Sequence, residues 1–518
     1  MNWLVLRKNH REWAKTGLAQ RVFESGLSLL VGLIVGIMII FSYGLASDWQ
    51  QLVLVIPVAL VFVLLINDLE KLVLTSIAIG VPLNLDVSII ISPYSRNPEN
   101  VARGFRTLIA LTELRVSLVL ITLVVGYALW IARSRDSDRK SALFSASTTV
   151  PALGFIFFSI LSVSQAQDLQ LSLFRVAQLI ELFLAYFYVA NHLRTIQDMQ
   201  FFVTVSLGGM LAESVLMIVQ WITGLSFQIA GIEAVILGPG RIGGTLGHTG
   251  PAAGYLSAQA LIAGAMIWAY PKMPQKILAA ACLGIGLVAL VSTGSRIGWI
   301  GFAATILMYI LTGLRHGWVK RETLILLAIA VAALAAGFYD TIYTRYTADD
   351  RGSAEARPKM YRLAWNMIQA RPWLGVGAGN QALATRDYYT TDVGDPEDIF
   401  DIQAHNAYLA VWAESGPFAL LCYIGFFIAG ILTAWSCVRS RHTWISSLGA
   451  GLGLAIVSLC IQMFTGTFHT RAITLFTWIL PALAVSLHHL EQKRLAREPI
   501  EVSDTSVRPS RYAVAYEK

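Results

Sequence analysis

Long apolar runs alternate with short polar stretches along most of this 518-residue chain. The runs have about 17 to 25 residues, the helix length that crosses the hydrocarbon core of a bilayer. A helix satisfies its own backbone hydrogen bonds within lipid, so the runs predict membrane helices. We expect about fourteen spans (twelve to fourteen), centred near residues 35, 58, 81, 120, 153, 180, 210, 261, 286, 304, 330, 420, 454 and 481.

The two weakest of these spans are the ones near 81 and 120. Pro82, Asn84 and Asp86 interrupt the first apolar run, and Glu113 and Arg115 interrupt the second. Losing both would leave the predicted orientation unchanged.

Basic residues between the spans predict that orientation. The short segments ARSRDSDRK, PKMPQK, LRHGWVKRE and CVRSRHTW all fall on the side of the N-terminus when the spans are counted. Short loops rich in Lys and Arg stay in the cytoplasm. An even number of spans then places both termini there, and the remaining connections face outward.

This count divides the chain into five parts. Residues 1–25 form a basic interfacial segment, with no cleavage site typical of a signal peptide, and residues 26–338 carry spans 1–11. Residues 339–404 form one long outward loop that contains interfacial helices. Residues 405–490 carry spans 12–14, and residues 491–518 are expected to be a disordered cytoplasmic tail.

Composition agrees with this picture and excludes some functions. The chain is 56% apolar and only 14% charged, whereas soluble domains are typically about 25% charged. Its net charge of +7 is explained by the loops and does not predict a nucleic-acid partner. The four cysteines show no metal-ligand spacing, so we predict no metal site from them.

Two arginines stand out in the predicted outward segments. Arg241 lies in GPGRIGGTLGHTG, where glycines such as Gly243 and Gly244 let the backbone approach a ligand closely. Arg296 lies in STGSRIGWIG, a short gap between two spans, where an uncompensated charge costs about 3 kcal/mol. Because guanidinium groups match phosphate in geometry, the pair predicts a pyrophosphate clamp at the membrane surface. For Arg241, simple anchoring at the interface is the alternative.

The long outward loop contains one predicted helix and two irregular stretches. The helix lies within 357–375 and is predicted to rest in the interface, with Arg362 and Asn366 on its polar face; its apolar face carries Met360, Leu363, Met367 and Ile368. GVGAGN, which includes Gly375 and Gly377, predicts a flexible turn near a site. The acidic residues between 387 and 401 predict a solvated loop, with a divalent-cation site as the less favoured alternative.

Two groups of polar residues lie in or beside apolar runs. HNAYLAVWAESG begins with His405, whose pKa range suits a general base, although a helix cap or interfacial anchor is the alternative. Glu414 follows about 13 Å along the same helix, so we expect it to orient a neighbouring helix. In the span near 180, Arg175, Gln178 and Glu181 predict interhelical hydrogen bonds, with a proton or ion path as the alternative.

Four stretches together carry a resemblance: RIGGTLGHTG, TGSRIG, RPWLGVGAGN and HNAYLAVWAESG. In their order, spacing and common side they resemble the O-antigen ligase and polymerase family of bacterial membrane glycosyltransferases. The resemblance covers roughly residues 241–430. It implies an all-α, GT-C-like transmembrane bundle in the bacterial cytoplasmic (inner) membrane.

The resemblance also implies an activity. Such enzymes move a glycan from undecaprenyl diphosphate to an acceptor hydroxyl on the outer face, in cell-surface polysaccharide or lipopolysaccharide biosynthesis. They use no cofactor and no obligatory metal. The implied partners are an undecaprenyl-diphosphate-linked glycan, an acceptor glycan or glycolipid, and membrane lipids.

The resemblance assigns roles to individual residues. Arg241 and Arg296 match the two family arginines that bind the diphosphate, and His405 matches the histidine of the "HN" motif, which would accept the hydroxyl proton for inverting attack. The residues predicted to bind substrate are Asn406, Arg362, Gly375, Gly377, Gly243 and Gly244. In ligases the motif continues with a glycine and, three residues later, Gly, Thr or Tyr. Gly416 fits but Ala419 does not, so a polymerase or another acceptor stays open.

Two other functions are consistent with the helix count. One is a transporter of inorganic carbon or another small anion, and the other is a non-catalytic component of polysaccharide export. We favour the enzyme because the unusual charges lie on one face of the membrane and not at its midplane. The enzyme hypothesis requires Arg241, Arg296 and His405 to share one outward cavity.

Overall fold

The computed structural model describes ten stretches of the chain: residues 68–83, 86–91, 113–133, 144–229, 232–236, 241–320, 336–347, 353–393, 403–468 and 470–497. The spans predicted near 35, 58 and 330 lie outside them. So do the N-terminal segment 1–25, the tail beyond 497 and the part of the acidic stretch from 394 to 402.

Nine helices within the described residues are long and apolar enough to cross a membrane. They are α9 (Ala146–Ser162), α10 (Leu169–His192), α11 (Ile196–Thr223), α12 (Thr249–Ala269), α13 (Met273–Ser292), α14 (Arg296–His316), α19 (Ala407–Ser436), α20 (Thr443–Gln462) and α21 (Arg471–Leu495). Each matches one predicted span. The all-α polytopic fold class is confirmed.

The span predicted near 81 is corrected by the structure, and the one near 120 is an apolar helix whose described part, α8 (Leu118–Arg133), has 16 residues. In place of a span centred near 81 there is a short helix, α4 (Leu69–Leu83), followed by strand β1 (Asp86–Ile91). Strand β2 (Glu113–Ser117) precedes α8. The 15-residue α4 is about 22 Å long, too short for a bilayer of about 30 Å. Strands β1 and β2 pair antiparallel, with Val87 opposite Val116.

A second small sheet leads into the central helices. Strands β3 (Phe227–Ile229), β4 (Ile232–Ile236) and β5 (Ile242–Gly244) pair antiparallel in the order β3-β4-β5. This meander follows α11 and returns the chain to the start of α12. The sequence did not predict strands here, because a loop and a short strand can have the same interrupted apolar pattern.

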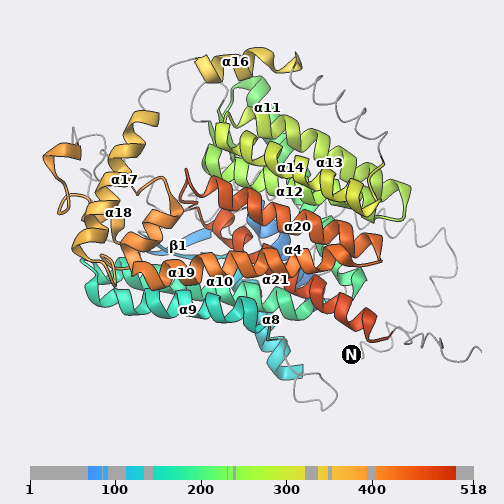
Figure 1. Cartoon of the computed structure of the whole chain (residues 1–518), viewed down its shortest axis with the longest axis horizontal. Coiled ribbons are helices and arrows are strands. Elements are labelled where there is room, and N and C mark those ends of the chain that lie inside the picture. The colour runs from blue at the N-terminus through green and yellow to red at the C-terminus, as the bar shows by residue number, and fades with distance from the viewer. Residues whose placement is uncertain are drawn as a thin grey trace, which may run out of the picture.

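The centre of the bundle is formed by α12 and α20, which pack against each other and against α13, α14, α19 and α21 (Figure 1). In α12, 89% of the apolar window is buried, whereas α14 buries only 28% and lies at the periphery. Small residues allow the close contact: a Cβ at Gly451 of α20 would lie 2.7 Å from the Cβ of Ala265 in α12.

The long loop before α19 forms short helices at one end of the bundle. They are α16 (Tyr339–Thr347), α17 (Ser353–Ala370), α18 (Gln381–Ala384) and the 3-10 turn η3 (Thr391–Val393); a further turn, η4 (Cys437–Arg439), ends α19. Figure 1 shows α17 and α18 together beside α19. The predicted apolar face of α17 is buried, and Leu363, Met367 and Ile368 pack in one cluster with Val376 and Ala413. It therefore packs against protein, and helix formation ends at Ala370 before Pro372.

Candidate functional site

A cavity of about 390 Å³ lies where α12, α14 and α19 begin. Helices α16 and α17 and the segment 465–468 complete its wall. Its ionisable lining residues are all cationic or imidazole groups: Arg241, Arg296, Arg345, Arg357, His248 and His405. No acidic side chain among the described residues lines it. The three residues that the enzyme hypothesis requires together are therefore brought together, although they are far apart in the sequence.

Arg241 reaches the cavity because strand β5, which follows it directly, packs against α11. Thr245 donates its backbone N–H (2.9 Å) and its hydroxyl (2.6 Å) to the carboxylate of Glu213. From this anchored strand the guanidinium group of Arg241 donates to the Thr249 hydroxyl at 3.2 Å, on the first turn of α12. The side chain is therefore held beside a helix N-terminus.

Gly243 and Gly244 lie in strand β5 and support its packing. Neither glycine lines the cavity, although both were predicted to bind substrate. Gly244 has a φ of +58°, and a Cβ there would collide with the Glu213 carboxylate. A Cβ at Gly243 would lie 3.1 Å from the backbone nitrogen of His248. Both glycines therefore allow close packing of the strand instead of contact with a ligand.

Arg296 is the first residue of α14 and lies in the short turn after α13, as predicted. The Ser295 hydroxyl caps the helix by accepting the Gly298 N–H at 3.3 Å. Helix α16 packs over this turn: Arg345 donates its Nε–H to the Gly294 carbonyl at 2.8 Å, and the Tyr346 ring centre lies 6.0 Å from the Arg296 guanidinium carbon. Arg296 and Arg345 therefore lie next to each other in the wall of the cavity.

His405 precedes α19, and its backbone is fixed from three sides. Asn406 caps the helix, because its side-chain oxygen accepts the N–H groups of Tyr408 and Leu409, each at 3.0 Å. Ala407 donates to the Met463 carbonyl at 2.9 Å, and the Tyr361 hydroxyl donates to the carbonyl of His405 at 3.2 Å. Asn406 does not line the cavity, so it positions His405 and is not placed to contact a substrate as predicted.

The electrostatics of the site keep both histidines neutral at pH 7. Burial, and then the positive charge of Arg357, lower the pKa of His405 below its ordinary value. Burial, then His405 and Arg241, lower the pKa of His248 to about 4. A neutral imidazole is the form that can accept a proton.

Sequence reasoning missed His248, Arg345 and Arg357. Arg345 and Arg357 come from different helices of the long loop, and no spacing relates either to Arg296. The only available signal for His248 was its place in RIGGTLGHTG, beside Arg241. The Nε–H of Arg357 is buried and has no hydrogen-bond partner among the described residues. Such a donor is unsatisfied until a ligand accepts from it.

Three predicted substrate-binding residues do not line the large cavity: Arg362, Gly375 and Gly377. Arg362 is exposed on α17 and lies outside the cavity lining. The loop with both glycines is buried and docks on α19: Val376 donates to the Ala413 carbonyl at 2.8 Å and Gly377 to the Glu414 carbonyl at 3.0 Å. The positive φ values of Gly375 (+66°) and Gly377 (+102°) serve this docking.

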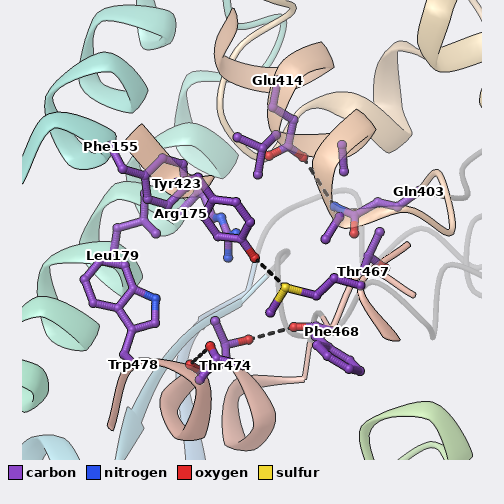
Figure 2. A pocket seen from close by; sticks show the side chains of 15 residues that line it. Phe155, Arg175, Leu179, Gln403, Glu414, Tyr423, Thr467, Phe468, Thr474 and Trp478 are labelled. Carbon is purple, nitrogen blue, oxygen red and sulfur yellow. Dashed lines mark hydrogen bonds between the residues drawn. The ribbon is translucent and has the colours of Figure 1, made fainter. Parts of the chain in front are cut away.

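A second, smaller cavity of about 40 Å³ lies next to the first, and the two share Thr467 and Phe468 in their walls. Figure 2 shows Arg175 and Glu414 reaching into it from different helices, with Tyr423 and Trp478 beside them. Gln403 donates to the Glu414 carboxylate at 3.3 Å. Its size suits a few water molecules and not a sugar ring.

The polar residues of the span near 180 contact neighbouring elements. Glu181 of α10 forms an ion pair with Arg471 of α21 and accepts the Ser117 hydroxyl at 3.0 Å. Arg175 donates to Gln178 at 2.7 Å within α10. The ion pair with Arg471 is therefore an interhelical contact of the kind expected for Glu181, whereas Arg175 and Gln178 bond to each other within one helix.

Taken together, these features give the large cavity the chemistry of an anion-binding site. Four guanidinium groups supply positive charge and planar donors, and the first turns of α12 and α14 lie in the cavity wall. A diphosphate has matching charge. Within the described residues no group of three or more His, Cys, Asp or Glu could hold a metal ion.

Within the described residues, nine apolar helices and a cationic cavity at their ends are the features of a polytopic membrane protein. The O-antigen ligase family model matches residues 278–424, from α13 to the first part of α19, and includes Arg296, Arg345, Arg357 and His405. The matched region is less than a third of the chain, and in this region the protein is similar to the O-antigen ligase family. A search of curated proteins found no match.

Proposed function

We propose that this protein transfers a glycan from undecaprenyl diphosphate to an acceptor hydroxyl at the outer face of the bacterial cytoplasmic membrane, by a metal-independent, inverting reaction. The observation that carries the proposal is the cavity in which four arginines and His405 meet, with no acidic side chain of the described residues in its wall. The family match supports the same reaction class.

The residues of the cavity have two chemical tasks, which are to stabilise negative charge and to accept a proton. Arg241, Arg296, Arg345 and Arg357 hold the diphosphate and stabilise the negative charge that grows on it as the bond to the anomeric carbon breaks. The neutral imidazole of His405 accepts the proton of the acceptor hydroxyl. The acceptor oxygen attacks the anomeric carbon from the face opposite the diphosphate, which inverts the configuration.

The reaction can be tested with the purified full-length chain in proteoliposomes. The donor is an undecaprenyl-diphosphate oligosaccharide, and the acceptors are a free repeat-unit glycan and a lipid A-core glycolipid. We expect release of undecaprenyl diphosphate, a product with inverted anomeric configuration by NMR, and unchanged rates in EDTA. Arg296→Ala and His405→Ala should each abolish most of the release, and full activity in both would refute their roles.

The choice of acceptor distinguishes a polymerase from a ligase, because only one of the two acceptors should be elongated efficiently.

The anion-transport hypothesis predicts a different result in the same vesicles. If labelled bicarbonate accumulated in the vesicles while no undecaprenyl diphosphate was released, the cationic cavity would be part of a transport path.

A further inference from the structure

The two ring nitrogens of His248 differ in their contacts. Its Nδ1 atom accepts the backbone N–H of Gly250 at 3.3 Å and thereby caps α12. The same ring lines the large cavity. Among the described residues, Nε2 makes no hydrogen bond.

The cap decides which ring nitrogen carries the proton. An imidazole nitrogen that accepts a hydrogen bond has no proton of its own, so a neutral ring must carry its proton on the other nitrogen. His248 is therefore held as the tautomer whose Nε2–H donates. It cannot accept a second proton on Nδ1 without losing the cap.

The surroundings keep the ring neutral. The ionisable groups that line the cavity with it, from every adjoining element, are all cationic or imidazole groups: Arg241, Arg296, Arg345, Arg357 and His405. Burial disfavours a positive imidazolium at this position, and repulsion by His405 and Arg241 adds to the cost, so the pKa of His248 falls to about 4. His248 therefore does not compete with His405 for the proton of the acceptor.

We infer that His248 is a fixed, neutral hydrogen-bond donor that binds an anionic oxygen of the lipid diphosphate beside Arg241. This inference rests on the proposed function and deepens it. The two histidines of the cavity have opposite tasks, since the Nε2–H of His248 donates to the leaving group and the ring of His405 accepts a proton. The cap of α12 sets the tautomer before any ligand arrives, which is a form of preorganisation.

Substitutions at position 248 can separate the cap from the donor. Serine is a preferred N-cap residue, so His248→Ser keeps a side-chain acceptor for the helix but has no group that reaches the cavity. His248→Ala removes both. His442 is a control for the substitution itself: it occupies the N-cap position of α20, but its side chain forms no cap hydrogen bond, is exposed and does not line the cavity.

The measurement is binding of undecaprenyl diphosphate and of undecaprenol to the full chain in nanodiscs. We expect His248→Ser to weaken undecaprenyl diphosphate roughly tenfold, to leave undecaprenol within about twofold, and to keep the thermal midpoint of the parent. His248→Ala should show the same loss of binding with a lower midpoint, and His442→Ser should match the parent.

Two results would overturn the inference: equal affinity of His248→Ser and the parent for undecaprenyl diphosphate, or an equal loss for both ligands, which would indicate a structural effect. Failure of the proposed function gives a different result. In that case the parent itself would bind undecaprenyl diphosphate no more tightly than undecaprenol.

Discussion

At the scale of single residues, Arg357 and Arg362 form a natural comparison on one helix. Arg357 lines the cavity with a buried, unsatisfied Nε–H, whereas Arg362 is exposed outside it. We expect Arg357→Ala to reduce the rate of glycan transfer at least tenfold, because a charge-assisted hydrogen bond contributes about 1.5–3 kcal/mol. Arg362→Ala, measured in the same proteoliposome assay, should stay within about twofold of the parent. The reverse order would favour the role that the sequence predicted for Arg362.

His405 gives a second residue-scale prediction, on pH. Its pKa is lowered, so the neutral base persists below the usual histidine range near 6.5 and kcat/KM should decline only at lower pH. Arg357→Gln removes a positive neighbour, so the pKa of His405 should rise and the acid limb of the profile should move to higher pH. The profile is normalised to each variant's own maximum. An acid limb that did not move would mean that His405 is not the titrating base.

The sequence singled out Arg241, Arg296 and His405 because each is an unusual polar group beside an apolar run, and such groups are costly in a membrane unless they have a partner or a function. His248, Arg345 and Arg357 carry no such mark. Arg345 and Arg357 lie in a polar loop where an arginine is ordinary, and only the packing of α16 and α17 over the helix ends brings them to the cavity.

At the scale of elements, the loop between α17 and α18 holds α17 against α19. Gly377 has a φ of +102°, and a Cβ there would lie 2.6 Å from the Cα of Ala166. We expect Gly377→Ala to lower the free energy of unfolding by roughly 1–3 kcal/mol, measured as a lower thermal midpoint in detergent.

Gly284 of α13 is the matched control, because a Cβ there has no neighbour within 4 Å, so Gly284→Ala should leave the midpoint equal or higher. The sequence assigned Gly377 to substrate binding. A raised KM with an unchanged midpoint would support that assignment against the structural role.

The same loop explains part of the HN motif. Gly416 has a φ of +84°, at a kink within α19, and a Cβ there would collide with the Trp373 carbonyl. The glycine therefore lets the loop approach the helix that His405 precedes. Sequence reasoning recognised this glycine as part of a pattern but could not supply the contact that requires it.

At the scale of the whole molecule, the cavity and the loop between α12 and α13 should face opposite sides of the membrane. Helix α12 begins at the cavity and runs about 30 Å to the turn that contains Lys272. We expect Asp340→Cys, exposed on α16, to react with a membrane-impermeant maleimide in intact spheroplasts, and Lys272→Cys to react only after permeabilisation. The unsubstituted chain measures any background from its four native cysteines. The opposite labelling pattern would show that the orientation is the reverse of the predicted one, and it would contradict a reaction at the outer face.

The sequence by itself determined the membrane helices, and it predicts the sidedness of the charged loops. Both depend on local quantities, the length of an apolar run and the count of basic residues next to it. The interrupted runs near 81 and 120 were less certain for the same reason, since local hydropathy cannot tell a broken span from a short helix beside a strand. Only the tertiary structure decided that the first turns of two helices, four arginines and two histidines enclose one volume. That arrangement depends on packing between segments far apart in the sequence, and it separates the glycines that shape the backbone from the side chains that face the cavity.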